Sequence, residues 1–80
     1  MKTIRVRYED TLQNQRGMTE EAVKTFATSP EELYKELRNQ HSFSLPHTAL
    51  KTSVNDEVVP MNTPLWEGDI VTFFALAAAN

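Results

Sequence analysis

Residues 70–76 read Ile-Val-Thr-Phe-Phe-Ala-Leu, a nearly unbroken run of β-branched, aromatic and aliphatic side chains that follows a polar turn at 67–69. Such a run predicts a strand that is either central in its sheet or buried on both faces. Near the start of the chain, Ile4, Val6 and Tyr8 alternate with polar side chains, which predicts a half-buried strand. Both segments are apolar enough to lie side by side in the middle of one sheet.

The segment between these two strands contains a strong helix signal. Residues 29–32 (Ser-Pro-Glu-Glu) combine a serine N-cap, a proline at the first helical position and a glutamate three residues after the cap. Leu33 and Leu37 then recur at helical spacing, so one stripe of this helix faces a core. We expect the helix to end before a connecting loop at 42–47, because Pro46 cannot continue it.

Shorter segments complete the order of elements. We expect a short polar helix within 9–17, a second strand at 21–26, a third strand at 50–54 and a short returning strand at 58–59. One long helix against a sheet is a two-layer arrangement. The sequence therefore predicts an α+β, β-grasp (ubiquitin-like) fold, in which a mixed sheet carries one main helix packed on one face.

The composition narrows the possible functions. A chain of 80 residues and 9.1 kDa predicts a single domain spanning 1–80. Because there is no cysteine, a disulfide framework, a thiolate metal site and a cysteine nucleophile are excluded. The net charge of −3 argues against a nucleic-acid partner, and no apolar run is long enough to span a membrane. Since the start of the chain also does not resemble a signal peptide, we expect a cytoplasmic protein.

The titratable side chains offer no catalytic or metal-binding constellation. His41 and His47 lie at a helix end and in a loop, with no candidate for a third ligand. The acids at 56–57 and 67–69 fall in turns, without the buried setting that raises the pKa of a general acid. We therefore expect no enzyme activity, no catalytic residue and no bound metal. Trp66 has two interpretations, a lid on the core or an exposed anchor for a partner.

Four stretches of the chain resemble one family of proteins. They are the helix opening at 29–33 and the segments 54–59 (Val-Asn-Asp-Glu-Val-Val), 63–65 (Thr-Pro-Leu) and 67–74 (Glu-Gly-Asp-Ile-Val-Thr-Phe-Phe). Together they are similar to the small subunit of molybdopterin synthase (MoaD) and, more distantly, to the thiamine sulfur carrier (ThiS). The resemblance extends over essentially the whole chain, and the extra segment at 9–17 favours the MoaD branch.

This resemblance implies a sulfur carrier that works with other proteins rather than an enzyme. In the family, the carboxylate of a Gly-Gly tail is adenylated with ATP by an E1-like enzyme and converted to a thiocarboxylate. The tail then enters the large synthase subunit, where the sulfur is transferred to a pterin precursor. The implied partners are therefore the large subunit of molybdopterin synthase and an E1-like adenylating enzyme. No cofactor is expected on the chain itself, because the activating partner uses the ATP.

The tail departs from the family pattern. Ala79 and Asn80 stand where the family carries Gly-Gly, so they are the degenerate counterpart of the carrier terminus. Glycine allows the close backbone approach that a narrow tunnel requires, and both replacements add bulk there. Two hypotheses follow: a carrier subunit of the MoaD type whose thiocarboxylation these two residues put in question, and a β-grasp interaction module that has lost the sulfur-carrier chemistry.

A candidate partner surface follows from the same resemblance. Where the family carries an apolar residue after the first strand, this chain has Glu9, which adds a negative charge to the patch that meets the large subunit. A carboxylate in an apolar interface is costly unless it is paired, so we expect a basic residue opposite it or a different partner. The remaining partner-binding positions implied by the resemblance are apolar: Val58, Phe74, Leu76, Ala77 and Ala78.

Overall fold

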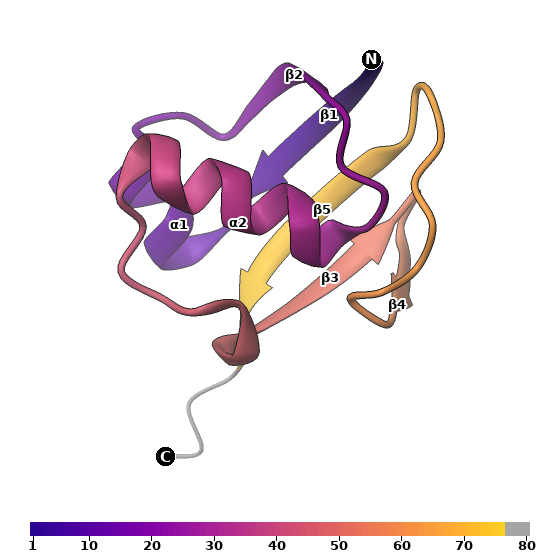
Figure 1. Cartoon of the computed structure of the whole chain (residues 1–80). Coiled ribbons are helices and arrows are strands. Elements are labelled where there is room, and N and C mark those ends of the chain that lie inside the picture. Colours follow the sequence, from indigo (N-terminus) through magenta and orange to yellow (C-terminus); the bar gives the residue numbers. More distant parts are fainter. Residues whose placement is uncertain (77–80) are drawn as a thin grey trace.

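Five strands of the computed structural model, which describes residues 1–76, form one sheet in the order β2-β1-β5-β3-β4 (Figure 1). The strands are β1 (Lys2–Tyr8), β2 (Glu20–Thr25), β3 (Leu50–Val54), β4 (Glu57–Val59) and β5 (Ile70–Ala75). β1 and β5 are parallel neighbours, and the other neighbouring strands are antiparallel. The predicted mixed sheet, with the first and last strands side by side in the middle, is confirmed.

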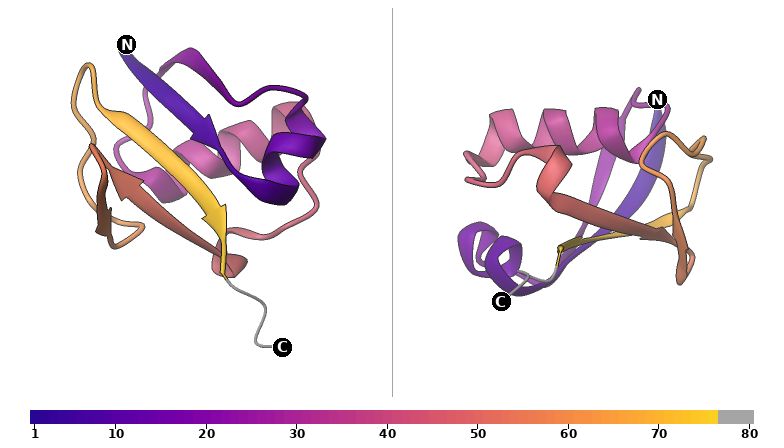
Figure 2. Two further views of the ribbon diagram at one scale, coloured as in Figure 1. Left: turned by 180° about the vertical axis from the view of Figure 1, so that it is seen from behind. Right: turned by 90° about the horizontal axis from the view of Figure 1, so that it is seen from below.

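Two α-helices, α1 (Asp10–Arg16) and α2 (Pro30–His41), and a short 3-10 helix (His47–Ala49) connect the strands. α2 lies across one face of the sheet, whereas α1 packs at the end of β1 and β5 (Figure 2). In the view from behind, no helix of residues 1–76 lies across the opposite face, and α1 is only beside it. The β-grasp prediction is therefore confirmed, and β5 is a central strand whose second face has no helix over it.

The hydrophobic core lies between α2 and the sheet. Residues that are paired between the two parallel strands, Val6 with Val71 and Tyr8 with Phe73, all point into this core. The stripe of α2 that the leucine spacing predicts is buried opposite them: Leu33, Tyr34 and Leu37. Alternation in the strands and helical spacing in α2 therefore predict the same core.

Helix α2 begins where the sequence predicts, with one difference in its cap. The Glu32 N–H donates to Ser29 Oγ at 3.3 Å, as expected for a serine N-cap. The Glu32 carboxylate, however, accepts from the N–H and the hydroxyl of Thr28, at 2.9 and 3.0 Å, rather than from the Ser29 N–H. These two bonds stabilise the charged carboxylate and so lower the pKa of Glu32.

The short polar helix predicted within 9–17 is α1, and one apolar side chain anchors it. Leu12 is completely buried in the core. Gly17 ends the helix at φ 81°, and its N–H donates to the Gln13 carbonyl at 2.8 Å. Gln15 also ties α1 to the loop after α2, because its side-chain amide donates to Ser44 Oγ at 2.7 Å and accepts from Ser44 N–H at 3.0 Å. A mostly polar helix is thus held firmly at the end of the sheet.

Candidate functional site

The side of the sheet without a helix, here called the open face, brings together residues that the sequence analysis assigned to partner binding. It consists of the odd-numbered residues of β1 and β3 and the even-numbered residues of β2, β4 and β5, because side chains alternate along each strand. Val58 pairs with Ser53, and Ser53 pairs with Thr72. Val58 and Phe74 therefore lie on the same side of the sheet, as a shared partner surface requires.

Leu76 extends this apolar surface beyond the last residue of β5. Its N–H donates to the Ala49 carbonyl at 2.9 Å, which continues the ladder between β3 and β5 by one step. Alternation then places Leu76 on the same side as Phe74. Val58 and Leu76 are 63% and 42% exposed, and Phe74 is half-buried. The open face thus presents apolar side chains up to the point where the chain leaves the sheet.

A carboxylate and an ammonium group flank Phe74 on this face. Glu9 has an extended backbone, and its N–H donates to the Phe73 carbonyl at 3.3 Å, so it continues β1 beside β5. By alternation Glu9 lies on the open face next to Phe74, and Lys51 is paired with Phe74 from the other side. Both side chains are exposed, and neither forms an ion pair within residues 1–76. The sequence analysis found Glu9 but missed Lys51, which alternation along 50–54 could have placed on this face.

The other charges of β1 on the open face are already paired. Arg5 Nη1 lies 2.8 Å from Glu20 Oε2, and Arg7 Nη1 lies 3.7 Å from Asp56 Oδ1. About half of the side-chain surface of Arg5, Arg7 and Glu20 is exposed to water, so these pairs contribute little to stability. They are the solvated charges of a strand face, and Lys51 and Glu9 differ from them in having no described ion-pair partner.

The predicted carrier terminus, Ala79 and Asn80, follows this face along the chain. Leu76 is the last residue that the structure describes, so Ala77, Ala78, Ala79 and Asn80 lie outside the described residues. β5 runs toward the end of the sheet that also carries α1 and the 3-10 helix at His47–Ala49 (Figure 1). The chain therefore leaves the sheet between Glu9 on one side and Ala49 on the other.

The residues that carry the family resemblance form a structural connection rather than a reactive group. Asn55, at φ 53°, accepts from the Ile70 N–H through Oδ1 at 3.0 Å and donates to Asp69 Oδ1 through Nδ2 at 3.1 Å. The second Asp69 oxygen accepts from the Trp66 N–H at 2.8 Å. Asn55 and Asp69 thus join the turn between β3 and β4 to the start of β5, which explains why both residue types occur at these positions.

Replacing Asn55 with glycine should lower the free energy of unfolding by about 1–2 kcal/mol, because two hydrogen bonds are lost while glycine still accepts the positive φ. Urea denaturation followed by circular dichroism measures the change. Asp56→Gly is the matched control, since Asp56 also has a positive φ (69°) but makes no such connection to β5. Equal losses in the two variants would show that the connection through the Asn55 side chain contributes nothing.

A polar cluster at the edge of the core contains three titratable groups whose pKa values are shifted, Tyr8, Arg16 and Glu21. The Tyr8 hydroxyl donates to Glu21 Oε2 at 2.6 Å, and Arg16 donates to both Glu21 oxygens at 2.8 and 2.9 Å. The hydrogen bond from Arg16 is the main cause that lowers the pKa of Glu21, while burial raises the pKa of Tyr8. A general acid needs a carboxyl whose pKa is raised, so Glu21 is unsuited to that role.

The two histidines lie beside different carboxylates. His41 Nε2 is 3.9 Å from Glu21, and His47 Nε2 is 3.9 Å from Glu31. Within residues 1–76, no group of three or more His, Asp or Glu side chains could hold a metal ion. Neither histidine therefore has the additional ligands near it that a metal site needs.

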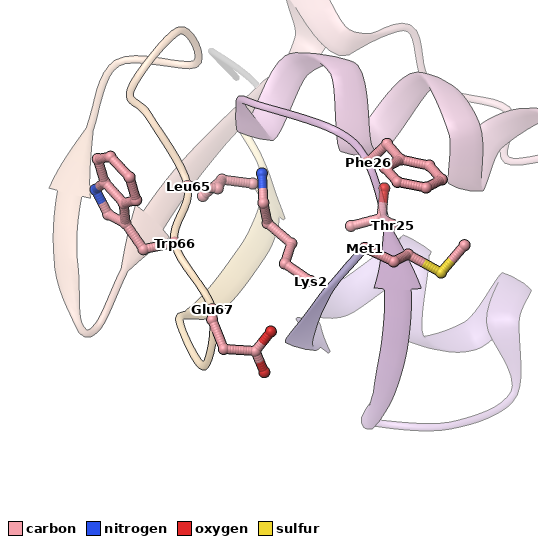
Figure 3. Close-up of a pocket in the computed structure, with 7 residues that line it drawn as sticks. All are labelled: Met1, Lys2, Thr25, Phe26, Leu65, Trp66 and Glu67. Atoms are coloured by element: carbon pink, nitrogen blue, oxygen red, sulfur yellow. The ribbon is translucent and has the colours of Figure 1, made fainter.

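Trp66 is not a lid on the core, so that interpretation is wrong. Its side chain is 70% exposed, whereas the neighbouring Leu65 is 3% exposed. The Leu65 N–H donates to the Thr28 carbonyl at 3.0 Å, which fixes this loop so that Leu65 turns inward and Trp66 outward (Figure 3). Phe26 is also exposed, and it lies outside β2 although the predicted strand included it. Phe26 and Trp66 line a shallow hollow of about 370 Å³, to which Met1 also contributes.

The strand order, with the single long helix on one face, defines a β-grasp protein of the ubiquitin-like class. Comparison with known families then places the chain within that class: residues 6–78 match the model of the ThiS family, and the chain belongs to this family. The recognition of a MoaD/ThiS-like protein is therefore confirmed. No curated protein matches the chain.

Several solved structures of differently named proteins have the same fold. A putative molybdopterin converting factor subunit 1 from Pyrococcus furiosus matches with a TM-score of 0.77 at 18% identity, covering 94% of this chain and 98% of the other. Small archaeal modifier protein 1 from Methanosarcina acetivorans matches with a TM-score of 0.79 at 11% identity, over 100% and 98%. A complex of subunits 1 and 2 of the molybdopterin-converting factor from Helicobacter pylori matches with 0.67 at 19% identity, over 98% and 99%. At these identities the matches show the fold alone.

Within residues 1–76, neither α-helix has the length and apolar character needed to cross a lipid bilayer.

Proposed function

We propose that this chain is a small, non-catalytic carrier subunit of the molybdopterin synthase type, which docks on a larger subunit through its open face. One observation carries the proposal: the open face presents the apolar side chains of Val58, Phe74 and Leu76, and the chain continues from Leu76 to the predicted carrier terminus, Ala79 and Asn80. Docking through this surface would bring the segment that follows β5 to the partner. The complex of subunits 1 and 2 from Helicobacter pylori is a precedent for such an assembly.

In this role residues 1–80 act as one domain in the cytoplasm, and the chain binds no cofactor itself. An E1-like enzyme uses ATP to adenylate the terminal carboxylate, and a sulfur donor then replaces one carboxylate oxygen with sulfur. The tail then enters the larger subunit, where the sulfur is transferred to a pterin precursor. The chain contributes the docking surface and the terminal carboxylate, which is consistent with the lowered pKa of Glu21 and the exposed positions of Asp56, Glu57 and Glu67.

Thiocarboxylation can be tested by intact mass spectrometry. A chain that ends at Asn80 and its Ala79→Gly, Asn80→Gly variant are each incubated with ATP, an E1-like adenylating enzyme of the family and a sulfur donor. We expect the Gly-Gly variant to gain the mass difference between sulfur and oxygen more rapidly than the natural sequence, because glycine allows the close backbone approach that the activating site requires. Incubation without ATP is the control.

The outcomes separate the two hypotheses of the sequence analysis. A mass gain on the natural chain supports the carrier function. A gain on the variant alone supports the alternative, a β-grasp interaction module that docks in the same way without sulfur chemistry, which Ala79 and Asn80 favour. If neither chain gains sulfur while a Gly-Gly carrier of the same family does, the carrier proposal is wrong.

A further inference from the structure

The open face has a central line of side chains, apolar except for the buried Thr72, with polar rows on both sides. The line consists of the even-numbered residues of β5 and the residue that follows by alternation: Ile70, Thr72, Phe74 and Leu76. We call it the β5 spine. On the β1 side, Arg5, Arg7 and Glu9 lie beside the first three positions of the spine. On the β3 side, Asn55, Ser53 and Lys51 lie beside the same three positions.

This arrangement is self-complementary under one particular symmetry. If two copies face each other about a two-fold axis that runs along β5, each β3 row lies opposite the β1 row of the other copy. Lys51 then faces Glu9 of the second copy, and Ser53 faces Arg7 of the second copy. An axis across the strands would instead place β3 against β3 and β1 against β1, so that Lys51 of one copy would not meet Glu9 of the other. The charges therefore select the axis along β5.

We propose that two copies of this chain associate through their open faces about a two-fold axis along β5. The dimer packs the β5 spine of one copy against that of the other and forms the Lys51–Glu9 pair twice. Both side chains are available, because they are exposed and form no ion pair within residues 1–76. Leu76 is 42% exposed at the end of the spine and lies opposite Leu76 of the second copy, so association removes apolar surface from water.

Self-association would also cover the surface that the proposed function assigns to a larger subunit. The two states would then exclude each other, but the dimer itself does not depend on that function.

Sedimentation equilibrium with the full chain and designed charge reversals tests the dimer. For the natural sequence, we expect the average mass to rise from 9.1 kDa toward twice that value as the concentration increases. Lys51→Glu and Glu9→Lys should each weaken association at least about tenfold, because each variant places like charges opposite each other twice. An equimolar mixture of the two variants should associate again, since both pairs become complementary in the mixed dimer.

The restored association in the mixture is specific to this geometry. Lys35→Glu is the matched control, since it makes the same charge change on α2 and should leave association unchanged. Circular dichroism of each variant confirms that it is folded. A natural chain that stays at 9.1 kDa at all concentrations overturns the proposal, as does a mixture of the two variants that associates no better than either alone. Both results would leave the proposed carrier function untouched.

Discussion

Replacement of Leu12 by alanine should lower the free energy of unfolding by about 2–5 kcal/mol, the usual loss when a large aliphatic side chain is removed from a core. Leu12 is completely buried and is the only apolar side chain of α1. Without it, the remaining fixed contacts of this helix are polar, including the Gln15–Ser44 and Arg16–Glu21 bonds. A domain of this size is stabilised by roughly 4–12 kcal/mol in total, so the loss is a large fraction.

Urea denaturation monitored by circular dichroism measures this loss, with Gln13→Ala as the matched control on an exposed position of the same helix. Hydrogen exchange adds a local readout: the α1 amides should exchange faster in Leu12→Ala than in the control, because the helix loses its anchor. If Leu12→Ala and Gln13→Ala unfold at the same urea concentration, Leu12 does not anchor α1.

The elements of the fold follow well from local sequence because each has its own signal. The apolar run at 70–76 and the alternation from Ile4 to Tyr8 identify the two central strands, and the serine cap with proline identifies the start of α2. These signals depend on residues close together in the chain, where side-chain direction and capping are decided. The same reasoning predicted β-grasp topology, since two apolar strands and one amphipathic helix have few ways to share a core.

The candidate site is less predictable because it depends on register between strands. Alternation assigns Lys51 and Phe74 each to one of two faces, but only the pairing of β3 with β5 brings them into contact. Glu9 joins them because β1 continues for one residue beyond its last paired position. A shift of two residues in either pairing would keep each side chain on its face but separate Lys51 from Phe74, and the alternation of a single strand does not distinguish these registers.

Trp66 and Tyr8 show two other limits. In a loop, side-chain direction depends on contacts with distant segments, and the bond from Leu65 to Thr28 turns Trp66 outward. Tyr8 fits the alternation of a core residue and is indeed buried, but its hydroxyl also belongs to a polar cluster with Glu21. That cluster could not be predicted, because its members come from β1, α1 and β2 and have no common spacing.

Replacement of Glu21 by glutamine should cost about 1–3 kcal/mol, because it leaves Arg16 without its charged partner in a partly buried setting. The two side chains are only 23% and 17% exposed, so water screens this pair less than the pairs on the open face. Tyr8→Phe is the matched control, since it removes one hydrogen bond to the same carboxylate but keeps the ring and the ion pair. We expect Tyr8→Phe to lower the free energy of unfolding less than Glu21→Gln does.

The contribution of Glu21 should also depend on pH in a defined direction. Its hydrogen bond with Arg16 lowers its pKa in the folded chain below the ordinary value of 4.5. Below that value the unfolded chain binds more protons than the folded chain, so the stabilisation is complete above pH 4.5 and is lost as the pH falls through the lower folded pKa. Urea denaturation at about pH 7 and about pH 3 measures the free energy of unfolding of both chains. The natural chain should exceed Glu21→Gln by a smaller free energy at the lower pH. The comparison isolates Glu21, because the lowered pKa of Glu32 affects both chains equally. If the two chains differ in free energy of unfolding by the same amount at both pH values, Glu21 stabilises the fold by packing rather than by its charge.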